Sequence, residues 1–170
     1  DRDLFNTELA RHAAIMNHFD SYKLSIHTGS DKFSIYPIIA QETQGRVHVK
    51  TAGTSYVEAL RLVASGDPDL FRGIVAYACA HFAHDRKTYY LDAQVENVPA
   101  VNTLPAGELP ALLDHFDTRQ VLHVTFSSVL DRYGAAICTY LDAHETEYVT
   151  QLARHFDRHL RPFLTPALAV

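Results

Sequence analysis

LSIHTGSDKFS, residues 24–34, decides the fold because it takes a short strand through a polar loop into a helix. The predicted strand, Tyr22–His27, alternates apolar and polar side chains, and a period of two is typical of a β-strand with two different faces. One face carries Leu24 and Ile26, and the other carries Lys23, Ser25 and His27. A glycine and a serine follow, so we expect the strand to end there.

The stretch VHVKTAGTSY, residues 47–56, repeats this plan. A second strand is predicted over Arg46–Lys50, with His48 opposite two valines, and its loop also contains glycine and threonine. A third strand is predicted over Gln120–Phe126, where His123 lies on the polar face. Each strand then has one apolar face and one polar face with a histidine, whereas a purely structural parallel sheet is apolar on both faces. The polar faces therefore indicate a functional site.

Helical periodicity separates these strands. We expect helices over residues 4–19, 33–44, 54–66, 67–84, 109–116 and 132–160, with Gly134 and His144 weak enough to split the last one. Strands that alternate with helices indicate parallel pairing through crossovers. Three strands are too few for a complete barrel of about eight strands and about 250 residues. The prediction is an α/β fold that forms the C-terminal portion of a TIM-type (β/α) barrel, with residues 1–170 as a single α/β domain cut from a longer barrel. The alternative is a small three-layer α/β domain that is complete.

Composition narrows the class of protein. The 170 residues are 47% hydrophobic and 21% charged, and the net charge of −5 argues against a nucleic-acid-binding protein. No stretch has the ~20 apolar residues of a membrane span, and the acidic start does not resemble a signal peptide. The two cysteines, Cys79 and Cys138, are interpreted as reduced, buried thiols of a cytoplasmic protein. An open sheet edge would favour association into a homo-oligomer.

Three histidines are the strongest candidates for chemistry. His27, His48 and His123 lie on the predicted polar faces, and parallel strands bring their carboxyl ends to one edge. Neutral imidazole suits metal ligation and general acid–base catalysis equally well, so spacing leaves both open. The other histidines are assigned to surfaces and helix caps, and they are His12, His18, His81, His84, His115, His144, His155 and His159.

Two strand-to-helix loops provide a second signal. Each combines glycine, hydroxyl side chains and a lysine ahead of a helix whose first N–H groups are free, and such loops suit an anionic or polyhydroxylated ligand. The candidate loop residues are Gly29, Ser30, Asp31, Lys32, Lys50 and Thr54. Helix capping alone would explain the hydroxyl and carboxylate groups, but it would not require Lys32 or Lys50. No dinucleotide fingerprint or phosphate-binding P-loop is present.

The two loop stretches, together with DPDLFR (residues 67–72) and DRKTYY (residues 85–90), resemble the tagaturonate epimerase family. The resemblance covers nearly the whole chain but only the later part of the family's longer proteins. It implies a metal-dependent barrel enzyme of bacterial hexuronate catabolism that interconverts tagaturonate and fructuronate by inverting carbon 4. The implied cofactor is a divalent metal ion, and the implied partner is a small-molecule sugar acid.

The resemblance also implies roles for the candidate residues. His27 and His48 are the expected metal ligands, while Asp31, Lys50 and His123 are the expected catalytic residues. Substrate binding is assigned to Gly29, Ser30, Lys32 and Thr54. The alternative function is a sugar-acid or phosphate-binding module without metal or turnover. A structural domain whose polar faces pair internally is a third reading.

Overall fold

The structure is a computed structural model that describes residues 1–27, 29–51 and 54–164, without the side chains of residues 29–31, 54 and 88. The chain divides into two compact units. Unit 1 contains Asp1–Thr54 and the residues from Ala153 onward, and unit 2 contains Ser55–Leu152. Each unit is described by itself below. The single-domain organisation expected from the sequence stays a prediction.

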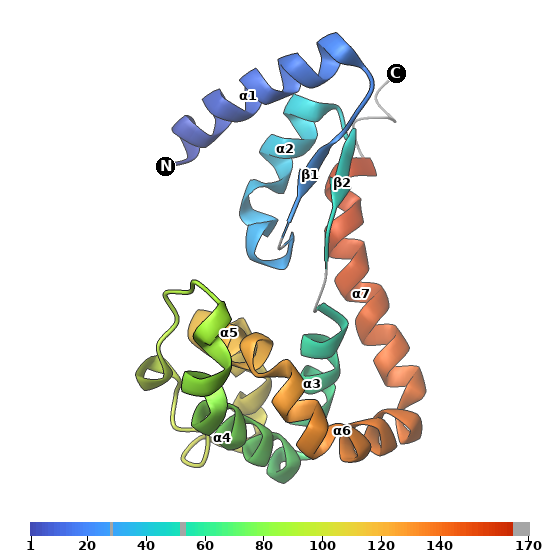
Figure 1. Ribbon diagram of the computed structural model, residues 1–170. Coiled ribbons are helices and arrows are strands. Elements are labelled where there is room, and N and C mark those ends of the chain that lie inside the picture. The colour runs from blue at the N-terminus through green and yellow to red at the C-terminus, as the bar shows by residue number, and fades with distance from the viewer. Residues whose placement is uncertain (28, 52–53, 165–170) are drawn as a thin grey trace. The chain divides into compact units, whose positions relative to one another are not determined.

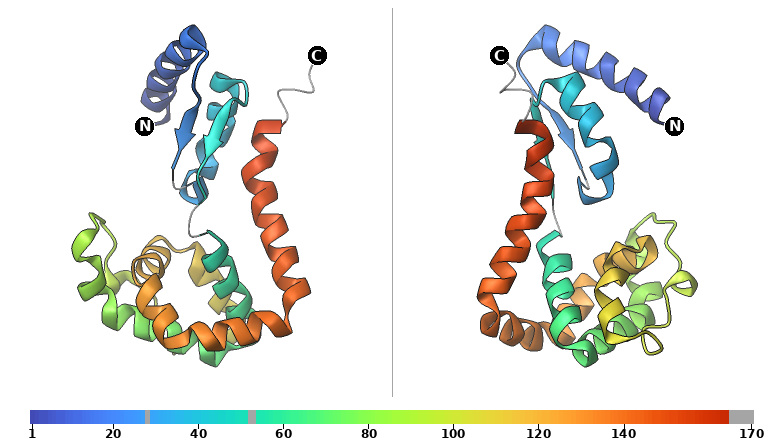
Figure 2. Two further views of the ribbon diagram at one scale, coloured as in Figure 1. Left: turned by 45° about the vertical axis from the view of Figure 1, so that its right-hand side comes forward. Right: turned by 180° about the vertical axis from the view of Figure 1, so that it is seen from behind.

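Unit 1 is a small α/β layer (Figures 1 and 2). Its elements are α1 (Arg2–Phe19), β1 (Leu24–Ile26), the 3-10 helix η1 (Gly29–Ile35), α2 (Tyr36–Thr43), β2 (Val47–Val49) and the last part of α7 (Glu145–Leu164). β1 and β2 pair in parallel, with Ser25 opposite His48. The two predicted strands and their parallel pairing are therefore confirmed.

The apolar face of the two strands forms the core of unit 1. Leu24, Ile26, Val47 and Val49 pack in a cluster around the buried Leu9, Tyr36 and Ile39 of α1 and α2. Burial of one face and exposure of the other fixes the register, because a one-residue slip would reverse every side chain. The alternation seen in the sequence thus assigns the correct residues to each face.

Short-range signals begin and end the helices of unit 1. The Asp1 carboxylate accepts hydrogen bonds from the backbone N–H groups of Asp3 and Leu4 at the start of α1. Pro37 stands in the first turn of α2, as expected. Gly45 follows that helix at φ +75°, and a Cβ there would lie 2.7 Å from the Phe163 carbonyl oxygen. Only glycine fits this position without strain.

In the described residues of unit 2, the regular secondary structure is entirely helical, and irregular connections join the helices (Figure 2). It contains α3 (Thr54–Gly66), α4 (Pro68–Asp85), the 3-10 helices η2 (Arg86–Thr88), η3 (Val95–Asn97) and η4 (Ala106–Asp114), α5 (Phe116–Val124), α6 (Phe126–Ala143) and the first part of α7. Phe71, Ile74, Leu60, Leu113 and Leu122 are among its fully buried core residues. The expected split of the last long helix is confirmed, because α6 ends at Ala143 and α7 begins at Glu145.

The third predicted strand is wrong. Gln120–Phe126 covers the last turn of α5, the Thr125 junction and the start of α6. Thr118, Val121, Leu122 and Thr125 are all buried, and this spacing of three and four is helical. The described residues therefore form one sheet of two strands, in a chain that is richer in helix than the sequence predicts.

Two further features bear on the sequence analysis. Both cysteines are free thiols, but neither is fully buried as expected, because Cys79 is half-buried and Cys138 is exposed. Among the residues described, no helix has the length and apolar character needed to cross a membrane.

Candidate functional site

The polar face of β1 and β2 is the centre of the candidate site. Ser25, His27, His48 and Lys50 are all exposed, and we call these four residues the strand face. The Ser25 Oγ lies 3.0 Å from the His48 Nδ1, as the parallel register requires. Backbone pairing continues past β1, because the Lys50 N–H donates to the Ile26 carbonyl at 2.8 Å. The Ser25 hydroxyl thus contacts the Nδ1 of the exposed His48 ring.

A cavity of about 190 Å³ adjoins the strand face. It is lined by Ser25, Ile26 and His27 of the strand, Lys32 and Ile35 of η1, Phe5 of α1 and Ile39 of α2. The Lys32 ammonium donates to the His27 carbonyl at 2.6 Å, which ties the loop back onto the end of the strand. An ammonium group has two more N–H donors, so Lys32 can still contact an anion at this cavity.

The structure brings together some of the predicted site residues in unit 1. His27, His48, Lys32 and Lys50 all belong to unit 1, at the ends of the two strands or in the adjoining loop. The side chains of Ser30, Asp31 and Thr54 lie outside the described residues, and Gly29 begins η1. His123 lies on α5 in unit 2, so its predicted place on a third parallel strand is wrong.

Sequence reasoning missed a buried polar chain in unit 1. The Tyr36 hydroxyl lies 2.8 Å from the His159 Nδ1, and the His159 Nε2 lies 2.9 Å from the His155 Nε2. Both histidines are buried, which corrects their assignment to surfaces and caps. Burial raises the pKa of Tyr36 to about 12, so its hydroxyl keeps its proton and can donate to His159. We call Tyr36, His159 and His155 the polar chain.

The polar chain lies against the loop that carries the candidate substrate residues. Phe33, which directly follows Lys32, packs with its ring centroid 4.6 Å from that of His159. The Arg158 guanidinium lies 4.3 Å from the centroid of the same Phe33 ring. The spacing of His155 and His159 by four residues, on the most amphipathic helix, is the sequence signal for a shared buried face.

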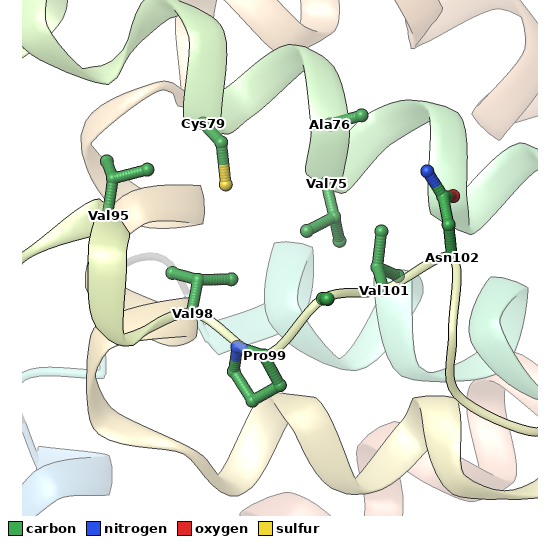
Figure 3. A pocket seen from close by; sticks show the side chains of 9 residues that line it. Val75, Ala76, Cys79, Val95, Val98, Pro99, Val101 and Asn102 are labelled. Carbon is green, nitrogen blue, oxygen red and sulfur yellow. The ribbon is translucent and has the colours of Figure 1, made fainter.

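Unit 2 has cavities of its own. One, of about 280 Å³, lies between α4 and the segment around η3, and Figure 3 shows the side chains of Cys79, Val75 and Val98 along it. Its lining is mostly apolar, and burial raises the pKa of the Cys79 thiol, which disfavours the reactive thiolate. The lining of a second cavity includes the charged and hydroxyl side chains of Asp85, Lys87 and Ser128.

Comparisons with known proteins identify the family. The model of the tagaturonate epimerase family, UxaE, matches residues 1–163. The chain belongs to the tagaturonate epimerase family. A tagaturonate/fructuronate epimerase of Thermotoga maritima is 40% identical over 158 residues, covering 92% of this chain and 33% of that protein.

Solved structures of a relative give the same family. The native crystal structure of the fructuronate-tagaturonate epimerase UxaE from Cohnella laeviribosi superposes with a TM-score of 0.91 at 37% identity, covering 96% of this chain and 35% of that one. A glycerol complex of the same enzyme gives a TM-score of 0.90 at 37% identity, with the same coverage of both chains. The chain spans about a third of the length of the relatives that it matches. The family expected from the sequence is thus confirmed.

The strand face of this tagaturonate epimerase family member contains two histidines, His27 and His48. The described residues include no group of three His, Cys, Asp or Glu side chains that could hold a metal ion. His27 and His48 provide two imidazoles, and Ser25 supplies the oxygen contact to Nδ1 that typically orients a ligating histidine. These residues could contribute to a divalent metal site but do not complete one by themselves.

Proposed function

We propose that this chain forms part of an isomerase that interconverts D-tagaturonate and D-fructuronate by inverting carbon 4. The observation that carries the proposal is the strand face, where two imidazoles and an ammonium group lie exposed and where Ser25 and His27 also line the cavity that contains Lys32. Membership of the tagaturonate epimerase family supplies the substrate class. The parallel strands are the expected support, because active sites of α/β folds lie at the carboxyl ends of such strands.

The reaction sets a clear requirement for these residues. Carbon 4 lies one carbon beyond the position that the ketone makes acidic, so simple enolisation cannot invert it. Retro-aldol cleavage and re-addition can do so with the ketone of the substrate as the electron sink, whereas transient oxidation at carbon 4 would also need a separate hydride acceptor. Both routes begin with loss of the proton from the hydroxyl on carbon 4, and both need the distant carboxylate to be held still.

The residues divide between these tasks. Lys50 and Lys32 would hold the substrate carboxylate, with the backbone of Gly29 and the hydroxyls of Ser30 and Thr54 assisting. Asp31 would accept the proton of the hydroxyl group on carbon 4. His27 and His48 would contribute ligands to a divalent metal ion. When bound, such an ion polarises the ketone and hydroxyl oxygens of the substrate as a Lewis acid.

The proposal extends to the wider fold and to the location of the enzyme. We place β1 and β2 as neighbouring strands of a TIM-type barrel, since their polar face would then line the barrel's catalytic end. We place the enzyme in the cytoplasm, where a hexuronate catabolic reaction and two free thiols would be expected.

The test is mutagenesis of the intact enzyme, expressed from its complete reading frame. His27→Ala and His48→Ala should each lower metal occupancy and reduce kcat/KM by on the order of 100-fold, and Ser25→Ala should reduce it by about tenfold. Lys50→Ala should mainly raise KM, by about tenfold, because it removes a charge-assisted hydrogen bond. Lys23→Ala, at the exposed lysine that directly precedes β1 and lies outside the strand face, is the matched control. It should change neither the metal occupancy nor the kinetic constants.

Metal content measured by elemental analysis and turnover of both sugar acids decide the outcome. Full occupancy and turnover in both histidine variants would remove the ligand assignment. Ligand binding without turnover in the wild-type enzyme would instead support a non-catalytic sugar-acid-binding module.

A further inference from the structure

The cavity of unit 2 whose lining includes charged and hydroxyl side chains is a candidate for a second ligand site. It has a volume of about 380 Å³, within the range of about 300–1,000 Å³ for small-molecule pockets. Its lining comes from the end of α4, from η2 and the residue after it, from the end of α5 and from the first turn of α6. The lining residues are His84, Asp85, Lys87, Tyr89, Val124, Ser127 and Ser128. We call this the Asp85 cavity.

Asp85 is an oriented, ionised carboxylate in this cavity. Its side chain is only 13% exposed, the Ser128 Oγ donates to its Oδ2 at 2.6 Å, and the His84 Nδ1 lies 2.9 Å from its Oδ1. The Ser128 hydrogen bond, followed by that of His84, lowers the pKa of Asp85. Each carboxylate oxygen has a second lone pair, so Asp85 can still accept hydrogen bonds from a ligand hydroxyl group.

A positive charge lies near this carboxylate. Lys87 lines the same cavity and is exposed, and within the described part of the chain it makes no ion pair. Its ammonium group is therefore available to an anion. Two serine hydroxyls and the Tyr89 phenol add groups that both donate and accept. The cavity thus combines one cation, one anion and several hydroxyl groups.

We propose that the Asp85 cavity binds an open-chain sugar acid, with Lys87 on the ligand carboxylate and Asp85 on its hydroxyl groups. A simple anion such as phosphate would be opposed by the Asp85 charge, and a neutral polyol would leave Lys87 unused. A ligand with one carboxylate and several hydroxyl groups satisfies both side chains. The DRKTYY stretch, residues 85–90, supplies three of the lining residues. Ligand binding at this cavity would give that stretch a function of its own, because it contributes no residue to the strand face.

The inference takes its ligand class from the proposed function, so the test separates the two by using D-gluconate. This sugar acid has the carboxylate and the hydroxyl groups but lacks the ketone, so its binding can be measured without turnover. In ¹⁵N–¹H correlation spectra of the chain, D-gluconate should cause saturable shifts at residues 84–90 and 126–129. D-Glucitol, which replaces the carboxylate by an alcohol, should bind about tenfold more weakly.

Paired variants sharpen the test. Lys87→Gln should raise the Kd for D-gluconate about tenfold, and it should not disturb folding because Lys87 is exposed. Lys23→Gln removes the same charge in unit 1 and should leave the Kd unchanged. Asp85→Asn should weaken binding of D-gluconate and D-glucitol alike, whereas Asp69→Asn, on the almost fully exposed Asp69, should weaken neither.

Each outcome decides the proposal. Shifts confined to the cavity, with the expected loss in Lys87→Gln, support it even if the intact enzyme shows no epimerase activity. An unchanged Kd in Lys87→Gln, or shifts that avoid residues 84–90 and 126–129, overturns it even if epimerase activity is found.

Discussion

The interiors of the two units differ in kind. Unit 2 is organised around apolar side chains from several helices, and its largest fully buried residues include Phe71, Phe82 and Leu113. Unit 1 has a smaller apolar cluster and places the polar chain, Tyr36, His159 and His155, beside it. Apolar packing is non-directional, whereas a hydrogen-bonded chain is satisfied in few geometries. Unit 1, which carries the strand face, is therefore the unit in which hydrogen bonds restrict the orientation of buried side chains more strictly.

The largest effect is expected from the core of unit 2. Phe71→Ala should lower the free energy of unfolding by about 3–5 kcal/mol, because Phe71 is fully buried and a cavity would remain. Phe19→Ala, at a position that is 63% exposed, should change it by less than about 1 kcal/mol. Urea denaturation followed by circular dichroism measures both. Equal losses would mean that the apolar core is not what holds unit 2 together.

The sequence predicts unit 1 well because its signals are local. Alternation over a few residues separates the faces of β1 and β2, and parallel register then sets Ser25 opposite His48. The same rule fails at Gln120–Phe126, where alternating letters also fit a helix. Tertiary contacts decide there, since Val121 and Leu122 are both buried in the helical core. A short apolar run cannot by itself distinguish these two periods.

In the candidate sites, too, some features follow from local sequence patterns and others depend on contacts between residues far apart in the chain. The place of His27 and His48 on the exposed face of unit 1 follows from local alternation, so that place could be predicted from the sequence. The polar chain joins Tyr36 to a histidine 123 residues away, and the Asp85–Ser128 bond spans 43 residues. No local pattern contains such contacts. Helical spacing indicates only that His155 and His159 share a face, and packing decides whether that face is buried.

A smaller effect is expected from the polar chain in unit 1. Tyr36→Phe removes the hydroxyl that contacts His159 while keeping the buried ring, so the free energy of unfolding should fall by about 1 kcal/mol. Tyr22→Phe, at an exposed tyrosine before β1, is the control and should be neutral. If Tyr36→Phe is also neutral in thermal and urea denaturation, the polar chain contributes nothing to the stability of unit 1, and the contrast with unit 2 disappears.

The smallest effect concerns the pH dependence of unit 2. The Ser128 hydrogen bond and, after it, the His84 contact lower the pKa of Asp85 in the folded protein. A carboxyl group whose pKa is depressed by folding stabilises the fold above its unfolded value of about 3.9, and that contribution is lost as the pH falls through the folded value. Ser128→Ala removes the largest cause of the lowered Asp85 pKa. It should therefore lower the free energy of unfolding at neutral pH, and the difference in free energy of unfolding from the wild-type protein should shrink as the pH drops below about 4.

Ser127→Ala, at the neighbouring serine of the same helix turn, controls for the loss of a hydroxyl group. Denaturation curves for the three proteins, recorded between about pH 3 and pH 7, measure this difference. A difference that stays constant over this range would show that Ser128 stabilises the helix junction without acting on the charge of Asp85.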